Sequence, residues 1–500
     1  MNTKALRQKV LDLAIHGKLV PQNPADESAE KLLEKIRAEK AEKIKKGELK
    51  ADKKDSFIFV GSDKRHYEQF ADGTVKDIED EIPFEVPEGW AWCRIKEISS
   101  EILYGVSESA KENGTYKLLR ITDIQDDSVN WDTVPFTDFP ENKVSNYLLK
   151  NNDIVFARTG ATVGKSYLIS NLNVPAIYAS YLIRIRLFSN FNYNYVKLFF
   201  NSPCYWNQIT DKSSGIGQPN VNGTSLSNLL IPIPTNNEQE KIVSITSNLF
   251  SQIDCLDENK SDLQSLINQT KSKILDLAIH GKLVPQDPND EPAEELLKCI
   301  ATSDNRPYKK LEEDDIPFEL PKNWIWQKLP TLCTIPITDG THKTPTYSDK
   351  ENGIPFLSSK DVTSGEIDWS KIKYITKELH EELYKRLAPQ KNDILLAKNG
   401  TTGVAALVKD DTVFDIYVTL ALIRPITEMI LPQYLLYIIN SHFCKNQFND
   451  HLTGIGVPNL HLVDINKTVI PIPPIKEQAR IVSKIDDLFA QLDTISEQLA

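Results

Sequence analysis

A glycine-containing loop follows a short apolar run at two places in this chain. The segment NDIVFARTG occupies residues 152–160, and the related segment NDILLAKNG occupies residues 392–400. Glycine lets the backbone approach a phosphate group closely, and a long cationic side chain beside it can reach the polar edge of a base. We expect both loops to contact such groups, although a plain turn with a solvated lysine nearby would give the same pattern. The candidate residues are Arg158, Thr159 and Lys165 in the first loop and Lys398, Asn399 and Thr401 in the second, with Arg120, His342, Lys343 and Lys360 behind them.

The first loop also resembles a nucleotide-binding P-loop, but its spacing does not fit. In GATVGKS, at residues 160–166, three residues separate the two glycines where the motif requires four, and Thr159 stands where a glycine is needed. The second loop, GTTGVAA, lacks the lysine and the serine. No dinucleotide-binding fingerprint, nucleophile elbow or paired-cysteine metal spacing occurs in the sequence. We therefore predict a chain without a catalytic centre, a metal site or a cofactor of its own.

Length and composition place these loops in a globular protein of several domains. The 500 residues are 40% hydrophobic and 26% charged, which allows two to four domains that each bury a core. The six cysteines lie far apart and form no Cys-x-x-Cys pair, so a reducing compartment fits best. No apolar run is long enough to cross a membrane. We expect a cytoplasmic protein.

The elements around the two loops are duplicated. The segment LDLAIHGKLVPQ occurs unchanged at residues 11–22 and 275–286, and further paired segments follow in the same order. The final residue aligns with position 261 of the first copy, whereas Met1 aligns with position 265. The helix of the second copy is therefore divided between the two chain ends, and the chain is a circularly permuted, pseudo-twofold repeat. The other paired segments are 80–92 with 314–326, 215–221 with 454–460, and 229–250 with 468–489.

Apolar residues recur at intervals of seven between the two copies. Residues 238–280 would extend roughly 65 Å as one helix, which is longer than a small domain is wide. This pattern predicts a coiled-coil helix whose antiparallel partner is the divided helix of the second copy. One series is Ile242, Leu249, Leu256, Leu263, Thr270 and Leu277, and the interleaved series is Ile253, Lys260, Ile267 and Ile274.

The repeat divides the chain into five parts. We predict a mixed α/β fold class, with globular α/β domains at 80–234 and 314–473 in which β-branched runs alternate with turns. Long antiparallel coiled-coil helices separate these two domains. A lysine-rich segment at 37–66, which has no counterpart in the second copy, is interpreted as a solvated helix rather than a binding site. The remaining parts are an N-terminal helical region at 1–79, a central long helix and turn at 235–313, and a C-terminal helix at 474–500.

Taken together, these motifs resemble those of the DNA specificity subunits of Type I restriction-modification systems. The resemblance rests on the twin LDLAIHGKLVPQ turns, on IPFEVPEGW and IPFELPKNW, and on the series that leaves each domain, and it covers nearly the whole chain. It implies two target-recognition domains that each read one half of an asymmetric, bipartite double-stranded DNA sequence. It also implies a non-catalytic subunit that directs adenine methylation or restriction by its partners. The series that leaves each domain includes Pro219, Asn220, Glu238 and Gln239 in the first copy and Pro458, Asn459, Glu477 and Gln478 in the second.

The same resemblance implies the partners. They would be double-stranded DNA, two modification (methyltransferase) subunits and the restriction/translocase subunits, and any cofactor would belong to those other chains. We expect Glu238, Gln239, Glu477 and Gln478 to lie on exposed helix faces that bind the modification subunits. The residues taken alone leave one alternative, a non-catalytic coiled-coil scaffold protein.

The charge of the chain bears on how it could bind DNA. The formal net charge is −12, and acidic side chains outnumber basic ones within both predicted globular domains. An isolated protein of this kind would gain little from phosphate neutralisation, which supplies much of the affinity for DNA. Within an assembly, partner subunits can hold the backbone while this chain supplies a few base contacts. The charge therefore favours an obligate partner.

Overall fold

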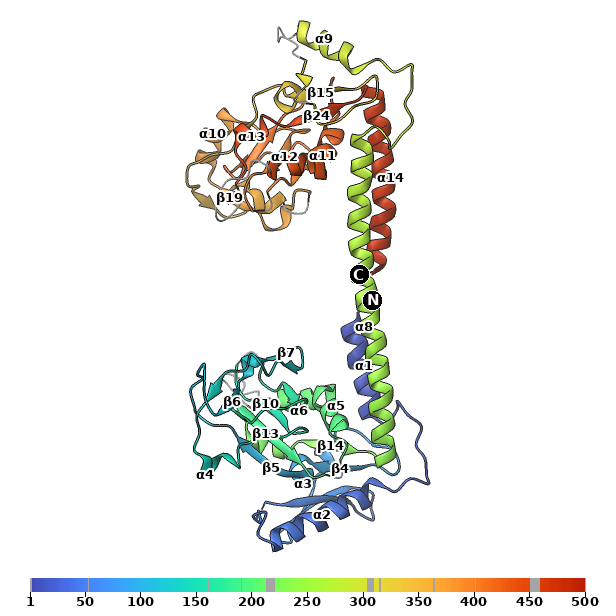
Figure 1. Cartoon of the computed structure of the whole chain (residues 1–500), viewed down its shortest axis with the longest axis vertical. Helices are drawn as coiled ribbons and strands as arrows, with labels where there is room; N and C mark the ends of the chain where they lie inside the picture. Colours follow the sequence, from blue (N-terminus) through green and yellow to red (C-terminus); the bar gives the residue numbers. More distant parts are fainter. Residues whose placement is uncertain are drawn as a thin grey trace. The chain divides into compact units, whose positions relative to one another are not determined.

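The computed structural model divides the chain into two compact units, Asn2–Asn259 and Lys260–Ala500, called here the N-terminal and C-terminal units. Each unit combines a mixed α/β domain with helices, as the sequence predicts (Figure 1). Within the part of the chain that is described, no helix is long and apolar enough to span a bilayer. The structure describes residues 2–52, 54–160, 162–189, 191–212, 221–303, 310–313, 316–362, 365–400, 402–449 and 459–499.

The N-terminal unit is built around a four-stranded antiparallel sheet in the order β11-β10-β13-β5. A second sheet, β12-β6-β9, contains one parallel pair, and the pair β14-β4 joins the domain to its flanking segments. The strands are β4 Ala91–Arg94, β5 Ser99–Tyr104, β6 Tyr116–Leu119, β7 Ile124–Gln125, β8 Ser128–Val129, β9 Phe136–Thr137, β10 Ile154–Ala157, β11 Ser166–Leu168, β12 Ala176–Tyr178, β13 Leu182–Leu187 and β14 Leu230–Ile233. The helices are α1 Thr3–Ile15, α2 Ala29–Lys45, α3 Ile95–Ile98, α4 Glu141–Val144, α5 Tyr193–Asn201, α6 Pro203–Lys212 and α7 Gly223–Ser227.

The C-terminal unit repeats this topology. Its sheets have the orders β16-β23-β20-β21 and β17-β19-β18-β22, and β15-β24 takes the place of β14-β4. The strands are β15 Ile325–Lys328, β16 Thr338–Asp339, β17 Tyr347–Ser348, β18 Ile354–Leu357, β19 Lys373–Ile375, β20 Ile394–Ala397, β21 Ala405–Leu407, β22 Asp415–Ile416, β23 Leu420–Ile423 and β24 Val469–Ile472. The helices are α9 Ala293–Ser303, α10 Lys377–Arg386, α11 Pro432–Asn440, α12 His442–Asn449, α13 Leu462–Ile465 and α14 Ile475–Leu499.

A long helix, α8 Asn236–Ile279, belongs with its first part to the N-terminal unit and with its second part to the C-terminal unit. The divided helix of the second copy packs on it as the sequence predicts. In the N-terminal unit Arg7 of α1 forms an ion pair with Asp254. In the C-terminal unit α14 is held by an ion pair between Lys271 and Asp493, and Ser496 donates a hydrogen bond to Gln264 at 2.8 Å.

The isoleucines of the interleaved series are buried, whereas Lys260 of that series is half-buried and the middle of the other series is exposed. Ile253, Ile267 and Ile274 are at most 7% exposed. Leu256 and Leu263 of the other series are 44% and 36% exposed. Leu256 and Leu263 lie between the parts of α8 that the two partner helices contact. The ion pair of α1 involves Asp254, and the hydrogen bond of α14 involves Gln264. A continuous seam of both series is therefore not formed within this chain.

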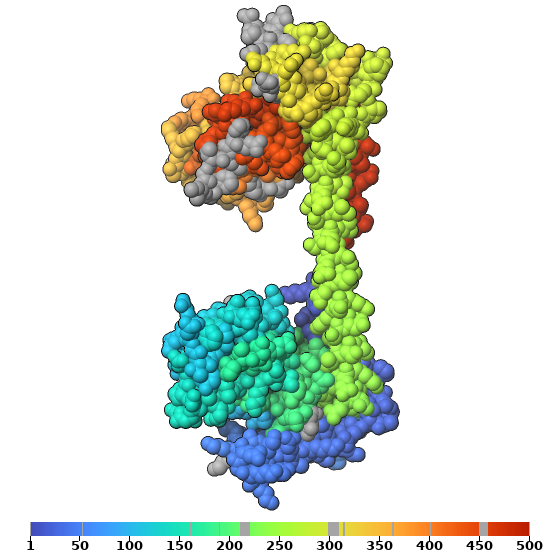
Figure 2. All heavy atoms as spheres, in the orientation of Figure 1, coloured from blue at the N-terminus to red at the C-terminus, as the bar shows by residue number. Residues whose placement is uncertain are grey.

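Residues 56–77 differ from the predicted helical region. They form a three-stranded antiparallel sheet of β1 Ser56–Val60, β2 His66–Phe70 and β3 Val75–Asp77, so the expectation of a helix over 37–66 is wrong beyond the end of α2. Arg94 of β4 donates hydrogen bonds to Glu68 of β2 at 2.8 and 3.2 Å, which ties this sheet to the domain. The aromatic and β-branched residues of SFIFV and the aromatic residues of HYEQF are the signal for strands. Figure 2 shows this N-terminal segment, in blue, covering one side of the unit.

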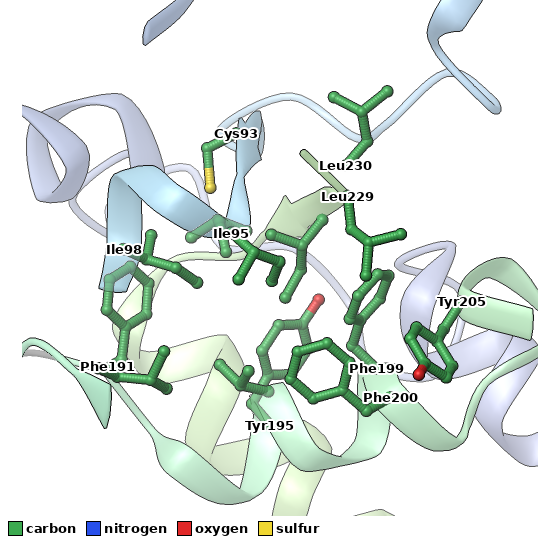
Figure 3. Packing of buried hydrophobic residues seen from close by; sticks show 14 of the residues in the cluster. Cys93, Ile95, Ile98, Phe191, Tyr195, Phe199, Phe200, Tyr205, Leu229 and Leu230 are labelled. Carbon is green, nitrogen blue, oxygen red and sulfur yellow. The ribbon is translucent and has the colours of Figure 1, made fainter. Parts of the chain in front are cut away.

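The core of the N-terminal unit lies where α5 and α6 meet the sheet and the β4–α3 segment. Phe199, Phe200 and Tyr205 are fully buried and pack in edge-to-face and tilted pairs with ring centroids 5.3 to 6.1 Å apart (Figure 3). Burying one such side chain contributes about 1.5–3 kcal/mol. Cys93 and Ile95 close the cluster from the other side (Figure 3). This packing fixes the frame from which the first loop emerges.

Candidate nucleic-acid interface

In each unit, residues of the repeated motifs form the same set of hydrogen bonds, which attaches the globular domain to its helices. In the N-terminal unit the Trp90 indole N–H donates to the Glu238 carboxylate at 3.1 Å. In the C-terminal unit Trp324 donates to Glu477 at 3.0 Å. Both carboxylates are 1% exposed, and burial raises the pKa of Glu477 despite the hydrogen bonds from Trp324 and Gln286. We call each of these arrangements a latch.

The glutamine that follows each carboxylate completes the latch. Gln239 accepts a hydrogen bond from the Asn192 N–H at 3.2 Å, and Gln478 accepts one from the Leu431 N–H at 2.8 Å. Both side chains are 0% exposed. The expectation that Glu238, Gln239, Glu477 and Gln478 lie on exposed helix faces is therefore wrong. Most of their polar atoms form hydrogen bonds inside the chain and hold the domain to the helix, although one carboxylate oxygen of Glu238, Oε1, is buried without a partner.

The LDLAIHGKLVPQ turns form the other side of each latch. The His16 ring stacks on Phe84 with centroids 3.8 Å apart, and His280 stacks on Phe318 at 4.1 Å. Each turn passes through a glycine with positive φ, at which a Cβ atom would collide with the proline of the following PEGW or PKNW segment. Only glycine fits there, which explains why the turn recurs unchanged.

The first loop leaves the end of β10 and carries two cations without a carboxylate partner. The guanidinium of Arg158 lies over the Tyr104 ring, 4.9 Å from its centroid. Its Nε atom is buried and makes no hydrogen bond. Lys165 is exposed, and Thr159 is half-buried. Neither Arg158 nor Lys165 forms an ion pair with any residue that the structure describes.

The second loop leaves the end of β20 and is built differently. Lys398 is 7% exposed, and its ammonium donates to Asp339 at 2.6 Å. Burial pushes the pKa of Asp339 up, but the hydrogen bond and charge of Lys398, with a smaller contribution from His342, leave it below its usual value. Lys398 therefore neutralises a neighbour instead of reaching outward, contrary to the expectation for this residue. Asn399 forms a β-bridge with Asn459, and Thr401 lies outside the described residues.

The remaining candidates are all near an acidic group. Arg120 pairs with Asp123 at 2.7 Å, and that carboxylate also accepts from the Arg120 backbone N–H. His342 lies 3.3 Å from Asp339, and its side chain is 69% exposed. Of these, His342 shares a partner with the second loop, because Lys398 also donates to Asp339. Lys343 pairs with Glu382, and Lys360 lies 3.8 Å from Asp361.

Backbone hydrogen bonds show that the two loops occupy equivalent positions. The Arg158 N–H donates to Tyr181 O at 3.0 Å, and the Lys398 N–H donates to Thr419 O at 2.8 Å. The residues after β5 and β16 match in the same way, because Gly105 bonds to Leu182 O and Gly340 to Leu420 O. Arg158 therefore corresponds to Lys398, Tyr104 to Asp339, and Tyr181 to Thr419.

Sequence reasoning did not find Tyr104, Tyr181 or Asp339. These residues are distant in the chain and reach the loops only through the pairing of β5 with β13 and of β16 with β23. The sequence alignment of the two copies carries no signal for that register. Among the described residues, no group of three or more His, Cys, Asp or Glu side chains is placed to hold a metal ion.

Comparison with known families agrees with this architecture. The family described as "Type I restriction modification DNA specificity domain" matches the chain twice, at residues 87–265 and 321–500. The two matches cover both globular domains and the helices that follow them. The chain therefore belongs to the Type I restriction modification DNA specificity family.

Individual relatives span nearly the same length. The chain is 28% identical to the Type I restriction enzyme EcoAI specificity subunit of Escherichia coli, over 97% of this chain and 89% of that protein. It is 25% identical to the EcoEI specificity subunit of Escherichia coli, over 99% and 90%. A solved chain from work on complex assembly and conformational transition of the type I R-M system shares the fold, with a TM-score of 0.53, 18% identity, and 83% and 94% coverage.

Proposed function

We propose that this chain reads an asymmetric, bipartite double-stranded DNA sequence, one half with each globular domain. The observation that carries the proposal is the pairing of a common frame with divergent loops. The latches and strand registers are the same in the two units, whereas Arg158 and Tyr104 in one loop correspond to Lys398 and Asp339 in the other. We call the two globular domains, 80–234 and 314–473, the first and second recognition domains.

The chain supplies specificity rather than catalysis. Its relatives are the specificity subunits of Type I restriction enzymes, and they match over almost their whole length. A pure scaffold would not need domains that diverge at equivalent loops while the frame stays constant. We propose that methyl transfer to adenine, and cleavage where it occurs, belong to modification and restriction subunits that bind this chain.

Exposed apolar residues of α8 support a docking position for the modification subunits. The latch residues are buried and cannot form a docking surface. Leu256, Leu263 and Leu266, which are 36% to 57% exposed, are the apolar side chains that α8 leaves uncovered in its middle part. We propose that the helical region, and not the latch, binds two modification subunits.

The test uses the chain in its assembly. It is co-expressed with its modification subunits in cells that lack adenine methylation, and modified adenines are mapped across the genome. We expect one asymmetric motif with two read segments and an unread gap of fixed length. Methylation at a contiguous palindrome, or an unchanged methylation pattern in cells without this chain, would overturn the proposal.

A further inference from the structure

One arginine differs from all the others that the structure describes. Ten of the eleven described arginines donate a side-chain hydrogen bond to a carboxylate or a backbone carbonyl. Arg158 donates none, and its Nε atom is buried without a partner. A desolvated polar atom without a partner costs free energy. The Nε atom of Arg184 also makes no hydrogen bond, but its other two nitrogens donate to groups of this chain, whereas every side-chain donor of Arg158 stays available to a ligand. The ten others are Arg7, Arg37, Arg65, Arg94, Arg120, Arg184, Arg186, Arg386, Arg424 and Arg480.

The side chain is nevertheless held in place. Its guanidinium lies over the Tyr104 ring, 4.9 Å from the centroid. The Tyr104 hydroxyl in turn accepts a hydrogen bond from the Gly223 N–H, at the start of α7, at 2.8 Å. The ring is therefore fixed at both ends, by β5 and by α7. Stacking on an aromatic face restrains the plane of a guanidinium without using its hydrogen-bond donors.

An exposed aromatic side chain stands next to this pair. The Arg158 N–H donates to the carbonyl of Tyr181, whose side chain is 62% exposed. Tyr104 itself is 38% exposed. A planar cation stacked on one accessible tyrosine, with a second exposed tyrosine hydrogen-bonded to its backbone, is a surface suited to the planar, polar edge of a base. A surface that bound only phosphate would need the positive charge, but it would not need a guanidinium plane that is held by an aromatic ring.

In the second recognition domain the cation at the equivalent position is already paired with a carboxylate of the same domain. Lys398 takes the place of Arg158, but its ammonium is buried against Asp339 at 2.6 Å. Arg386 also donates to the carbonyls of Asp339 and Gly340, at 2.6 and 2.8 Å, and this fixes the segment. No free cation remains at this position of the second domain within the described residues.

We infer that Arg158 reads a guanine in the half-site of the first recognition domain, and that the second domain makes no equivalent contact through Lys398. The inference rests on the proposed function. A guanidinium can donate two hydrogen bonds at once to O6 and N7 of guanine, and no other base offers that pair of acceptors in the major groove. Tyr104 acts as the positioning residue for this contact.

The experiment uses the complete assembly with its modification subunits. The wild-type motif is first obtained from mapped methylation, and a duplex with that motif is compared with duplexes that each carry one substituted base pair. Arg158→Ala and Arg158→Lys are tested, with Lys165→Ala as the matched control for an exposed cation of the same loop. Because Arg158 makes no internal hydrogen bond, assembly size and thermal unfolding should match the wild type, and these are measured first.

We expect both Arg158 variants to bind the wild-type duplex roughly ten-fold or more weakly and to lose discrimination at a single G·C pair of one half-site. Tyr104→Leu should lower discrimination at the same pair, whereas Tyr104→Phe should retain most of it. Lys165→Ala should instead weaken binding to all duplexes alike, as the loss of a phosphate contact does, and should not single out one base pair.

Two results would overturn the inference. The first is that Arg158→Ala lowers the affinity for all duplexes by the same factor and that Arg158→Lys restores the wild-type affinity. A phosphate contact behaves in this way, because any cation can make it on any sequence. The second concerns the half-site that the first domain reads, which is the half-site that changes when the first domain is exchanged. A wild-type motif without a guanine on either strand of that half-site would contradict the inference. A wild-type assembly without any sequence preference would instead refute the proposed function.

Discussion

The first and second recognition domains share a frame and differ in how a loop cation is used. In both, a tryptophan donates to a buried carboxylate at 3.0 to 3.1 Å, and a buried tyrosine hydroxyl donates to a proline carbonyl of the departing strand at 2.7 to 2.9 Å. At the equivalent loop position the first domain holds an unpaired arginine on a tyrosine, whereas the second buries a lysine against an aspartate. The residues that attach each domain to the helices are therefore different from the loop residues that are proposed to read DNA.

The largest expected effect comes from exchanging a whole domain. Replacing residues 80–234 with the matching domain of another specificity subunit should change one half-site of the motif and leave the other half-site unaltered. The reason is that Glu238 and Gln239 lie outside the exchanged segment and can fasten a new domain that supplies a tryptophan at the position of Trp90. Mapped adenine methylation measures both halves at once. A change in both half-sites would show that the two domains do not read independently.

The second prediction is that the stabilities of the two units depend differently on pH. Glu97 in the N-terminal unit is 3% exposed, and burial raises its pKa to about 7 even though Arg37 donates to it at 2.8 Å. The folded unit therefore binds an extra proton between about pH 4.5 and 7. The stability that this adds is fully present below pH 4.5 and is lost as pH rises through 7, by on the order of 3 kcal/mol.

Hydrogen exchange of core amides, followed unit by unit from pH 5 to 8, measures this loss. Glu97→Gln should flatten the dependence in the N-terminal unit. The C-terminal unit is the comparison, because backbone hydrogen bonds place Thr331 at the position of Glu97. Its Glu477, whose pKa burial also raises, gives that unit a pH dependence of the same sign, and Glu97→Gln should leave this dependence unchanged. An equal pH dependence in both units would contradict the assignment to Glu97.

The third prediction concerns the latch, which both units contain. Glu238→Ala and Glu477→Ala each remove a buried acceptor and leave an indole N–H without a partner. Each should destabilise its own unit by about 2 kcal/mol, and by similar amounts because the geometry is the same. Hydrogen exchange again resolves the two units. A loss of modification-subunit binding without any loss of stability would return these residues to a docking role.

The smallest effect distinguishes the two loop cations. Lys398→Ala leaves Asp339 with His342 as its remaining side-chain partner and should lower the stability of the C-terminal unit by about 1 kcal/mol. Arg158→Ala removes no internal hydrogen bond and should leave stability unchanged. Thermal unfolding of the two variants measures the difference. A comparable loss with Arg158→Ala would mean that this arginine also has a structural role.

The sequence predicted the architecture because its signals are local or repeated. The duplication, the divided helix and the mixed α/β domains all follow from identical segments and apolar spacing, and α1, α8 and α14 confirm them. The strands at 56–77 were missed because the lysines before them suggested a solvated helix. Leu256 and Leu263 repeat at the right interval, but a heptad pattern does not say whether a partner helix within the chain covers it.

The candidate site was predicted only in outline. The glycines marked both loops correctly as equivalent turns, but whether a cation is free depends on which side chain faces it across the sheet. Asp339 and Tyr104 lie about 60 and 50 positions before Lys398 and Arg158, and nothing in the local sequence links them. The latch carboxylates were assigned to a surface because their segments recur in both copies, on helices that the resemblance implies bind partner subunits. Their burial depends on indole donors far away in the chain.

The paired strands at the base of each domain have a consequence for inheritance. In the first domain the incoming and outgoing segments lie next to each other, with Leu230 opposite Arg94 and Ile233 opposite Ala91. In the second, Ile325 is opposite Ile472 in the same manner. A gene segment bounded by these strands encodes a complete reading surface with one point of attachment. Crossing over between related genes at those two boundaries is therefore expected to transfer a whole DNA preference in a single event, whereas point substitutions would have to alter it one contact at a time.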